Sequence, residues 1–116
     1  MLRGQLDGRG LELIQPLSRA LRQGEIHELV VTTEGEAGPG RRVDSVGYLA
    51  FFEVQSGGLA VTGDPVSWGE HFWTLVGFDL THAPNHLNLV VRGPSRLSGE
   101  ELGMRVGDRL VIGGIP

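Results

Sequence analysis

The stretch GYLAFFEV, residues 47–54, decides the fold of this chain. It is almost continuously apolar and has the length of a typical β-strand. An apolar run of this length, followed by the turn residues QSGG, predicts a strand that is covered on both of its faces. The protein is therefore expected to be built around a buried sheet.

Five further β-rich runs lie on either side of this strand, separated by glycine, proline and other turn residues. They are EIHELVVTT (25–33), GLAVTG (58–63), HFWTLVGF (71–78), HLNLVVRG (86–93) and DRLVIG (108–113). The 19 glycines and 6 prolines among 116 residues are too many for a helical bundle. The pattern predicts an all-β protein, a small closed or partly open antiparallel β-barrel, as a single domain over residues 1–116.

One short helix is expected before the first of these strands, in the segment PLSRALRQG (16–24). Pro16 suits a first helical turn, and Gly24 can end the segment. The two leucines between them are spaced i, i+4, which gives the segment an apolar stripe. The prediction is a helix over residues 16–23.

A second short helix is expected in SGEELG (98–103). Ser98 and Glu101 have the spacing of a capping box, and Gly103 supplies a stop signal. The prediction is a single helical turn at residues 99–102, leading into the last strand.

The composition excludes several classes of protein. With 40% apolar and 21% charged residues, the chain resembles ordinary soluble domains, and no apolar run approaches the roughly 20 residues of a membrane span. The start MLRGQLDGRG has no secretory pattern, and the absence of cysteine favours the cytoplasm. A net charge of −4 without a basic cluster argues against nucleic-acid binding.

The segment THAPNHLNLVV (81–91) carries the most suggestive polar residues. Strand alternation puts Leu87, Leu89 and Val91 on one face. The other face then begins with His86 and continues through Asn88, Val90 and Arg92. His82 lies in the preceding loop, and Pro84 disfavours a helix there, so the two histidines are not a helical metal-binding pair. We expect an ordered surface loop with His86 at the edge of a shallow pocket.

The order of strands and glycine turns resembles the glucitol/sorbitol-specific IIA component of the bacterial sugar phosphotransferase system. The similarity covers residues 25–113 and runs through ELVVTTEGEAGPG, GYLAFFEV, GGLAVTGDPVSWGEHFWTLVGF, NHLNLVVRG and VGDRLVIGG. Members of that family are small β-barrel proteins of about this size. The resemblance therefore implies a barrel fold.

The chain departs from that family at its reactive position. The family receives phosphate on a histidine in the strand that corresponds to GYLAFFEV, where this chain has Ala50, Phe51 and Phe52. Phosphoryl transfer through a side chain needs a nucleophilic atom, which neither alanine nor phenylalanine has. The resemblance thus implies a shared fold without the usual acceptor. His86 corresponds to a second histidine of the family.

The leading hypothesis is a non-enzymatic module, without a cofactor, that binds a small polar molecule or a protein partner. An imidazole and an amide on one strand face suit an anionic or polyhydroxylated ligand, and a tryptophan in a turn suits a contact surface. The candidate ligand-binding residues are His86, Asn88, His82, Asp79, His71 and Trp68. The plainer alternative for His86 is a histidine that donates a hydrogen bond to a loop carbonyl.

Two other functions stay open. One is a phosphocarrier that uses His86 in place of the missing acceptor. The other is a metal-assisted enzyme with a His82/His86 site, to which His71 and Asp79 could add ligands, although the four lack a recognised ligand spacing. No catalytic constellation stands out, and the sequence leaves the substrate and a homo-oligomeric state open.

The same alternation predicts the core. The residues expected to be buried are Leu29, Val31, Leu49, Phe51, Val61, Val76, Leu87, Leu89, Val91 and Ile112.

Overall fold

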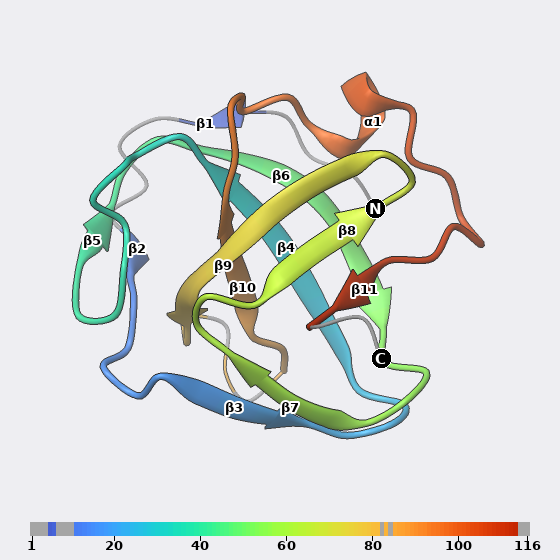
Figure 1. Ribbon diagram of the computed structural model, residues 1–116, viewed down its shortest axis with the longest axis horizontal. Helices are drawn as coiled ribbons and strands as arrows, with labels where there is room; N and C mark the ends of the chain where they lie inside the picture. The colour runs from blue at the N-terminus through green and yellow to red at the C-terminus, as the bar shows by residue number, and fades with distance from the viewer. Residues whose placement is uncertain (1–4, 7–10, 82, 84, 114–116) are drawn as a thin grey trace.

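Figure 1 shows the computed structural model, which describes residues 5–6, 11–81, 83 and 85–113. Of these residues 47% lie in strands and 4% in a helix, so the expected β-rich fold is confirmed. No helix among the described residues is long and apolar enough to cross a membrane.

One large sheet and two short ribbons make up the fold. The sheet contains β1 (Gln5–Leu6), β4 (Ile26–Thr32), β6 (Val46–Glu53), β8 (Pro65–Trp68), β9 (His71–Asp79), β10 (Asn88–Arg92) and β11 (Val111–Ile112). Its seven strands are ordered β1-β6-β4-β10-β9-β8-β11. One ribbon pairs β2 (Leu11–Glu12) with β5 (Arg42–Val43), and the other pairs β3 (Ser18–Leu21) with β7 (Gly58–Val61).

The sheet is mixed, which corrects the expected antiparallel arrangement. β10 runs parallel to β4, and every other pairing of the sheet is antiparallel. The described strands also form no closed barrel, because the two edge strands, β1 and β11, pair only with β6 and β8. Each edge strand is 2 residues long, which leaves little edge for a closing partner.

The core lies on both faces of this sheet. Leu29, Val31, Leu89 and Val91 belong to one buried cluster, which also includes residues of the β3–β7 ribbon. Val30 and Val90, which alternate with them, belong to a second cluster with residues of the β2–β5 ribbon. Because neighbouring residues of a strand point to opposite faces, each ribbon covers a different face of the sheet.

Seven of the ten expected core residues are buried, and Phe51, Val61 and Ile112 are only partly buried. The expected polar face of the strand at residues 86–93 is wrong. Val90 is 0% exposed and Asn88 is 1% exposed, because the β2–β5 side of the sheet is covered as well.

The helix α1 (Gly99–Leu102) is confirmed with its capping box. Ser98 Oγ accepts a hydrogen bond from the backbone N–H of Glu101, and the Glu101 carboxylate accepts one from the N–H of Ser98. Gly103 ends the helix with φ of 85°, a left-handed conformation that glycine adopts without strain.

The helix predicted over residues 16–23 is wrong, because Ser18–Leu21 forms strand β3. An isolated helix of two turns is marginal in water, whereas β7 offers the segment a ladder of backbone hydrogen bonds. Leu21 points into the core in this conformation. Gly24, with φ of 90°, forms the turn into β4 instead of a helix terminus.

Gly47 generates a prediction on stability. A Cβ atom at this position of β6 would lie far inside van der Waals contact with the backbone carbonyl of Arg96. We expect Gly47→Ala to destabilise the fold by about 1–3 kcal/mol, as overpacking typically does, measured by urea denaturation. The matched control is Gly58→Ala in β7, where an added Cβ meets nothing within 4 Å. Equal losses in both variants would contradict a close approach at Gly47.

Candidate functional site

Three polar side chains lie side by side on one face of the sheet, where β9 ends and β4 and β10 begin. Asn88 is in register with Glu28 of β4 on one side and with Asp79 of β9 on the other. Directly opposed residues of paired strands project to the same face. We call Glu28, Asn88 and Asp79 the polar row.

The polar row is fully buried, with exposures of 0% for Glu28, 1% for Asn88 and 2% for Asp79. Placing carboxylates in the interior costs free energy unless they are well paired, and apolar residues of similar size are often at least as stabilising. The row is therefore hard to explain by stability alone, which makes this end of the sheet a candidate functional site.

Asp79 is held firmly by its neighbours. Its Oδ2 accepts a hydrogen bond from Asn88 Nδ2 at 3.0 Å, and its Oδ1 accepts one from the Thr81 hydroxyl at 2.8 Å. The Thr81 backbone N–H also approaches Oδ2 at 3.3 Å. These donors fix the carboxylate in one orientation, whereas the buried Oδ1 of Asn88 has no hydrogen-bond partner among the described residues.

His86 joins the polar row to the molecular surface. Its Nε2 lies 3.9 Å from Glu28 Oε1, and its ring meets the Phe51 ring edge to face with centroids 5.1 Å apart. Only 16% of its side chain is exposed. His86 thus begins a largely covered face of the strand, because its ring packs against β4 and β6.

His27 is a second histidine at this end, and both of its ring nitrogens are engaged. The backbone N–H of Leu87 donates to Nδ1 at 3.0 Å. The hydrogen of the neutral ring must then be on Nε2, which donates to Glu25 Oε1 at 3.1 Å. His27 therefore ties the start of β4 to the segment that precedes β10.

A pocket of about 340 Å³ opens beside these two histidines. Arg19 of β3 and Glu25 supply its charged groups, and Leu80, Ala83 and Leu87 supply apolar walls. The Arg19 side chain makes no hydrogen bond or ion pair with any residue in the described part of the chain. The pocket thus presents one unpaired guanidinium beside a carboxylate and two imidazoles.

The structure brings together three of the six candidate ligand-binding residues. Asp79 and Asn88 are bonded to each other, and His86 lies above the same face. His82 lies outside the described residues. His71 and Trp68 are at the opposite end, because the 9 residues of β9 separate His71 from Asp79 by roughly 26 Å at 3.3 Å per residue.

This separation corrects the hypothesis of a metal site built from His71, Asp79, His82 and His86. His71 and Asp79 begin and end one extended strand, so they cannot coordinate the same ion. Within the described ranges, no group of three or more histidine, aspartate or glutamate side chains could hold a metal ion.

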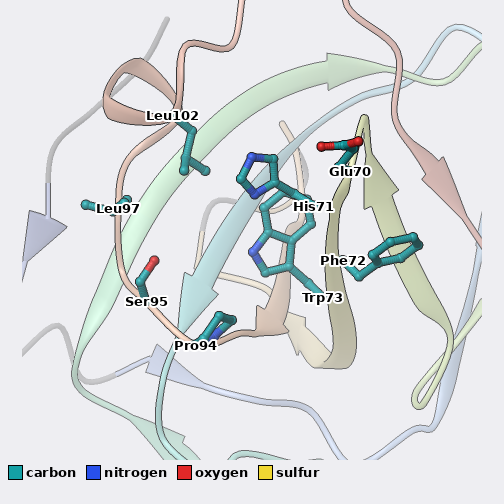
Figure 2. Close-up of a pocket in the computed structure, with 8 residues that line it drawn as sticks. All are labelled: Glu70, His71, Phe72, Trp73, Pro94, Ser95, Leu97 and Leu102. Carbon is teal, nitrogen blue, oxygen red and sulfur yellow. The ribbon is translucent and has the colours of Figure 1, made fainter.

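A second pocket, of about 290 Å³, lies at the His71 end of β9 (Figure 2). The His71 ring stacks on Trp73 at 17° and 6.0 Å, and on Trp68 at 18° and 5.2 Å. Figure 2 shows His71 and Trp73 facing Ser95, Leu97 and Leu102, which lie across the pocket. Trp68 and His71 are therefore in contact, but only His71 lines this pocket, which is distinct from the polar row.

Comparison with protein families assigns the chain to a group. Residues 1–113 match the family described as "Family of unknown function (DUF6917)". The chain belongs to this family. No curated protein and no solved structure matches it. Because the DUF6917 description states no activity, the resemblance to the IIA component stays a prediction.

Sequence reasoning missed several residues of this DUF6917 site. Glu28 and His27 lie in a run that the sequence predicts only as a strand, and Arg19 lies in the segment predicted as a helix. One signal was present, since a charged residue in the otherwise apolar run HELVV interrupts the pattern of a buried strand. Glu28, His27 and Arg19 come close to His86 only because of the order in which the strands pair, and a local sequence pattern does not reveal that order.

Glu25 gives the DUF6917 protein a testable dependence on pH. Its carboxylate accepts a hydrogen bond from the backbone N–H of Arg22 and another from His27, and these bonds lower the pKa of Glu25 below its ordinary value. A carboxylate with a lowered pKa stabilises the fold above its unfolded-state pKa, and this contribution is lost as the pH falls through the folded-state value.

We therefore expect Glu25→Gln to be less stable than the wild type at about pH 7, with the difference disappearing at about pH 2.5. Urea denaturation at both pH values measures this. Glu36→Gln, in an exposed loop, is the control for loss of one negative charge. A difference that persisted unchanged in acid would show that Glu25 does not act through its ionised carboxylate.

Proposed function

We propose that the protein is a non-enzymatic cytoplasmic binding module whose pocket beside His86 takes a small hydroxylated anion, of the sugar-acid or sugar-phosphate type. One observation carries the proposal. Arg19, whose side chain has no partner among the described residues, meets Glu25, His27 and His86 around a single pocket of about 340 Å³. A volume near the lower end of ligand pockets suits a small molecule.

The lining matches the parts of such a ligand. The planar guanidinium of Arg19 can bind a carboxylate or phosphate through two parallel hydrogen bonds. Glu25, whose pKa is lowered by the Arg22 and His27 bonds, is ionised at neutral pH and accepts hydrogen bonds from hydroxyl groups. Leu80 and Leu87 can pack against the carbon skeleton.

Binding is favoured over catalysis by the state of the two histidines. Both nitrogens of His27 are used within the fold, so it has no site left for proton transfer to a ligand. Nε2 of His86 is buried and faces Glu28. The two rings therefore shape the wall of the pocket, and ligand binding falls to Arg19 and Glu25.

Phe51 supports a second candidate, the phosphocarrier. It lies in the strand that carries the acceptor histidine in the resembling IIA family, and its ring contacts His86 at 5.1 Å. His86 is thus placed beside the position of the missing acceptor. Since Nε2 is buried, Nδ1 would have to accept the phosphoryl group.

Substitution of Arg19 tests the first candidate. Gluconate and glucose 6-phosphate are titrated against the wild type and Arg19→Gln by calorimetry. We expect Arg19→Gln to weaken binding by about tenfold or more, because a charge-assisted bidentate contact is lost. Arg22→Gln, an exposed neighbour that does not line the pocket, should bind like the wild type. Equal affinity of both variants, or equal binding of uncharged sorbitol, would contradict the proposed anion site.

Labelled phosphoenolpyruvate with the general phosphotransferase proteins tests the second candidate. Label on the wild type and none on His86→Gln would favour the carrier. Absence of label on the wild type would remove it and leave the binding proposal standing.

A further inference from the structure

The second pocket contains a hydrogen-bond donor that no described residue uses. Trp73 is 7% exposed, and its indole N–H has no acceptor among the described residues. Trp68 also stacks on His71, but its indole N–H donates to Asp108 Oδ2 at 3.1 Å. Buried tryptophans normally find a partner for this group.

The Trp73 donor faces the pocket. Figure 2 shows the nitrogen side of the indole directed toward the segment that carries Pro94 and Ser95. Gly93 allows this placement, because a Cβ atom there would lie 2.5 Å from Trp73 Cδ1. Any larger residue at Gly93 would push the indole away from the pocket wall.

Two other polar groups at the pocket are also unengaged. The Ser95 hydroxyl and the His71 ring nitrogens make no hydrogen bond with any residue in the described segments. Pro94, Leu97 and Leu102 supply apolar surface on the same side as Ser95, across the pocket from His71 and Trp73. The pocket therefore combines apolar side chains with hydrogen-bonding groups on both of its sides.

We propose that this pocket binds a small neutral molecule with a compact apolar body and one hydrogen-bond acceptor, a carbonyl or hydroxyl oxygen. The acceptor takes the hydrogen of the Trp73 indole, within reach of Ser95 and His71. The apolar body packs between the indole edge and the two leucines. A volume of about 290 Å³ limits the ligand to a few heavy atoms beyond a single ring.

A neutral ligand matches this lining better than an ion. Among the described residues that line the pocket, Glu70 is the one charged group and no arginine is present, so an anion meets repulsion without compensation. A cation is attracted by Glu70, but an ammonium group cannot accept the Trp73 indole hydrogen, and His71 covers one face of that ring.

This site is independent of the anion pocket. The two lie at opposite ends of β9, and they share no lining residue. Failure of one proposal therefore leaves the other intact.

The test uses four probes built on one six-membered ring: cyclohexanecarboxamide, cyclohexanol, cyclohexanecarboxylate and cyclohexylammonium. Binding is followed by the two indole N–H signals in ¹⁵N–¹H NMR spectra of the full chain, which contains two tryptophans. Trp68→Phe assigns these signals. We expect the carboxamide and the alcohol to shift the Trp73 signal saturably at millimolar concentration, with a smaller shift of the Trp68 signal. The two ionic probes should need about tenfold higher concentration.

Substitutions complete the test. Trp73→Phe keeps a ring but removes the donor and should abolish saturable binding of the carboxamide, followed by ligand-observed NMR. Ser95→Ala should weaken it severalfold, and Ser56→Ala, in an exposed turn, should not. If Trp73→Phe does not fold, the ranking of the four probes on the wild type decides alone. Equal or tighter binding of either ionic probe, or unchanged binding by Trp73→Phe, would overturn the proposal.

Discussion

The parallel pairing of β4 with β10 is the constraint on which the rest of the structure depends. Val30, Val31, Val90 and Val91 form its centre, and each is 0% exposed. Two adjacent strands that are buried on both faces need an apolar layer on each side. The β3–β7 ribbon supplies residues to one layer and the β2–β5 ribbon to the other, so these short elements are required by the central pair.

The same register creates the candidate site. Two residues before the paired valines, the parallel register places Glu28 of β4 beside Asn88 of β10. The antiparallel pairing of β10 with β9 places Asp79 on the other side of Asn88. The polar row thus occupies positions that the sheet buries in any case. A buried carboxylate is a poor source of stability, and its retention next to His86 and an open pocket is easier to understand if this end of the sheet binds a ligand.

Local pattern was enough to predict the strands and the capped turn at α1, because alternation and capping depend on neighbours in sequence. It failed for β3, where pairing with β7 outweighs the weak preference of a short segment for helix. It also failed for the site. Glu28 and Asn88 are distant in sequence yet adjacent in the sheet, whereas His71 and Asp79 are close in sequence and lie at opposite ends of one strand.

A β-bulge in β9 places the pocket at Trp73 and the carboxylate of Asp79 on opposite faces of the sheet, in addition to their separation along the strand. Val90 pairs with Gly77 and Val91 with Leu75, so Val76 is an extra residue in β9. Before the bulge, Trp73 and Leu75 face the first core cluster; Val76 faces the second, and Phe78 returns to the first. In a strand that alternated regularly throughout, Asp79, six residues after Trp73, would share the face of Trp73. The bulge turns it to the opposite face, where it meets Asn88, so one strand can serve an aromatic pocket at one end and a buried carboxylate at the other.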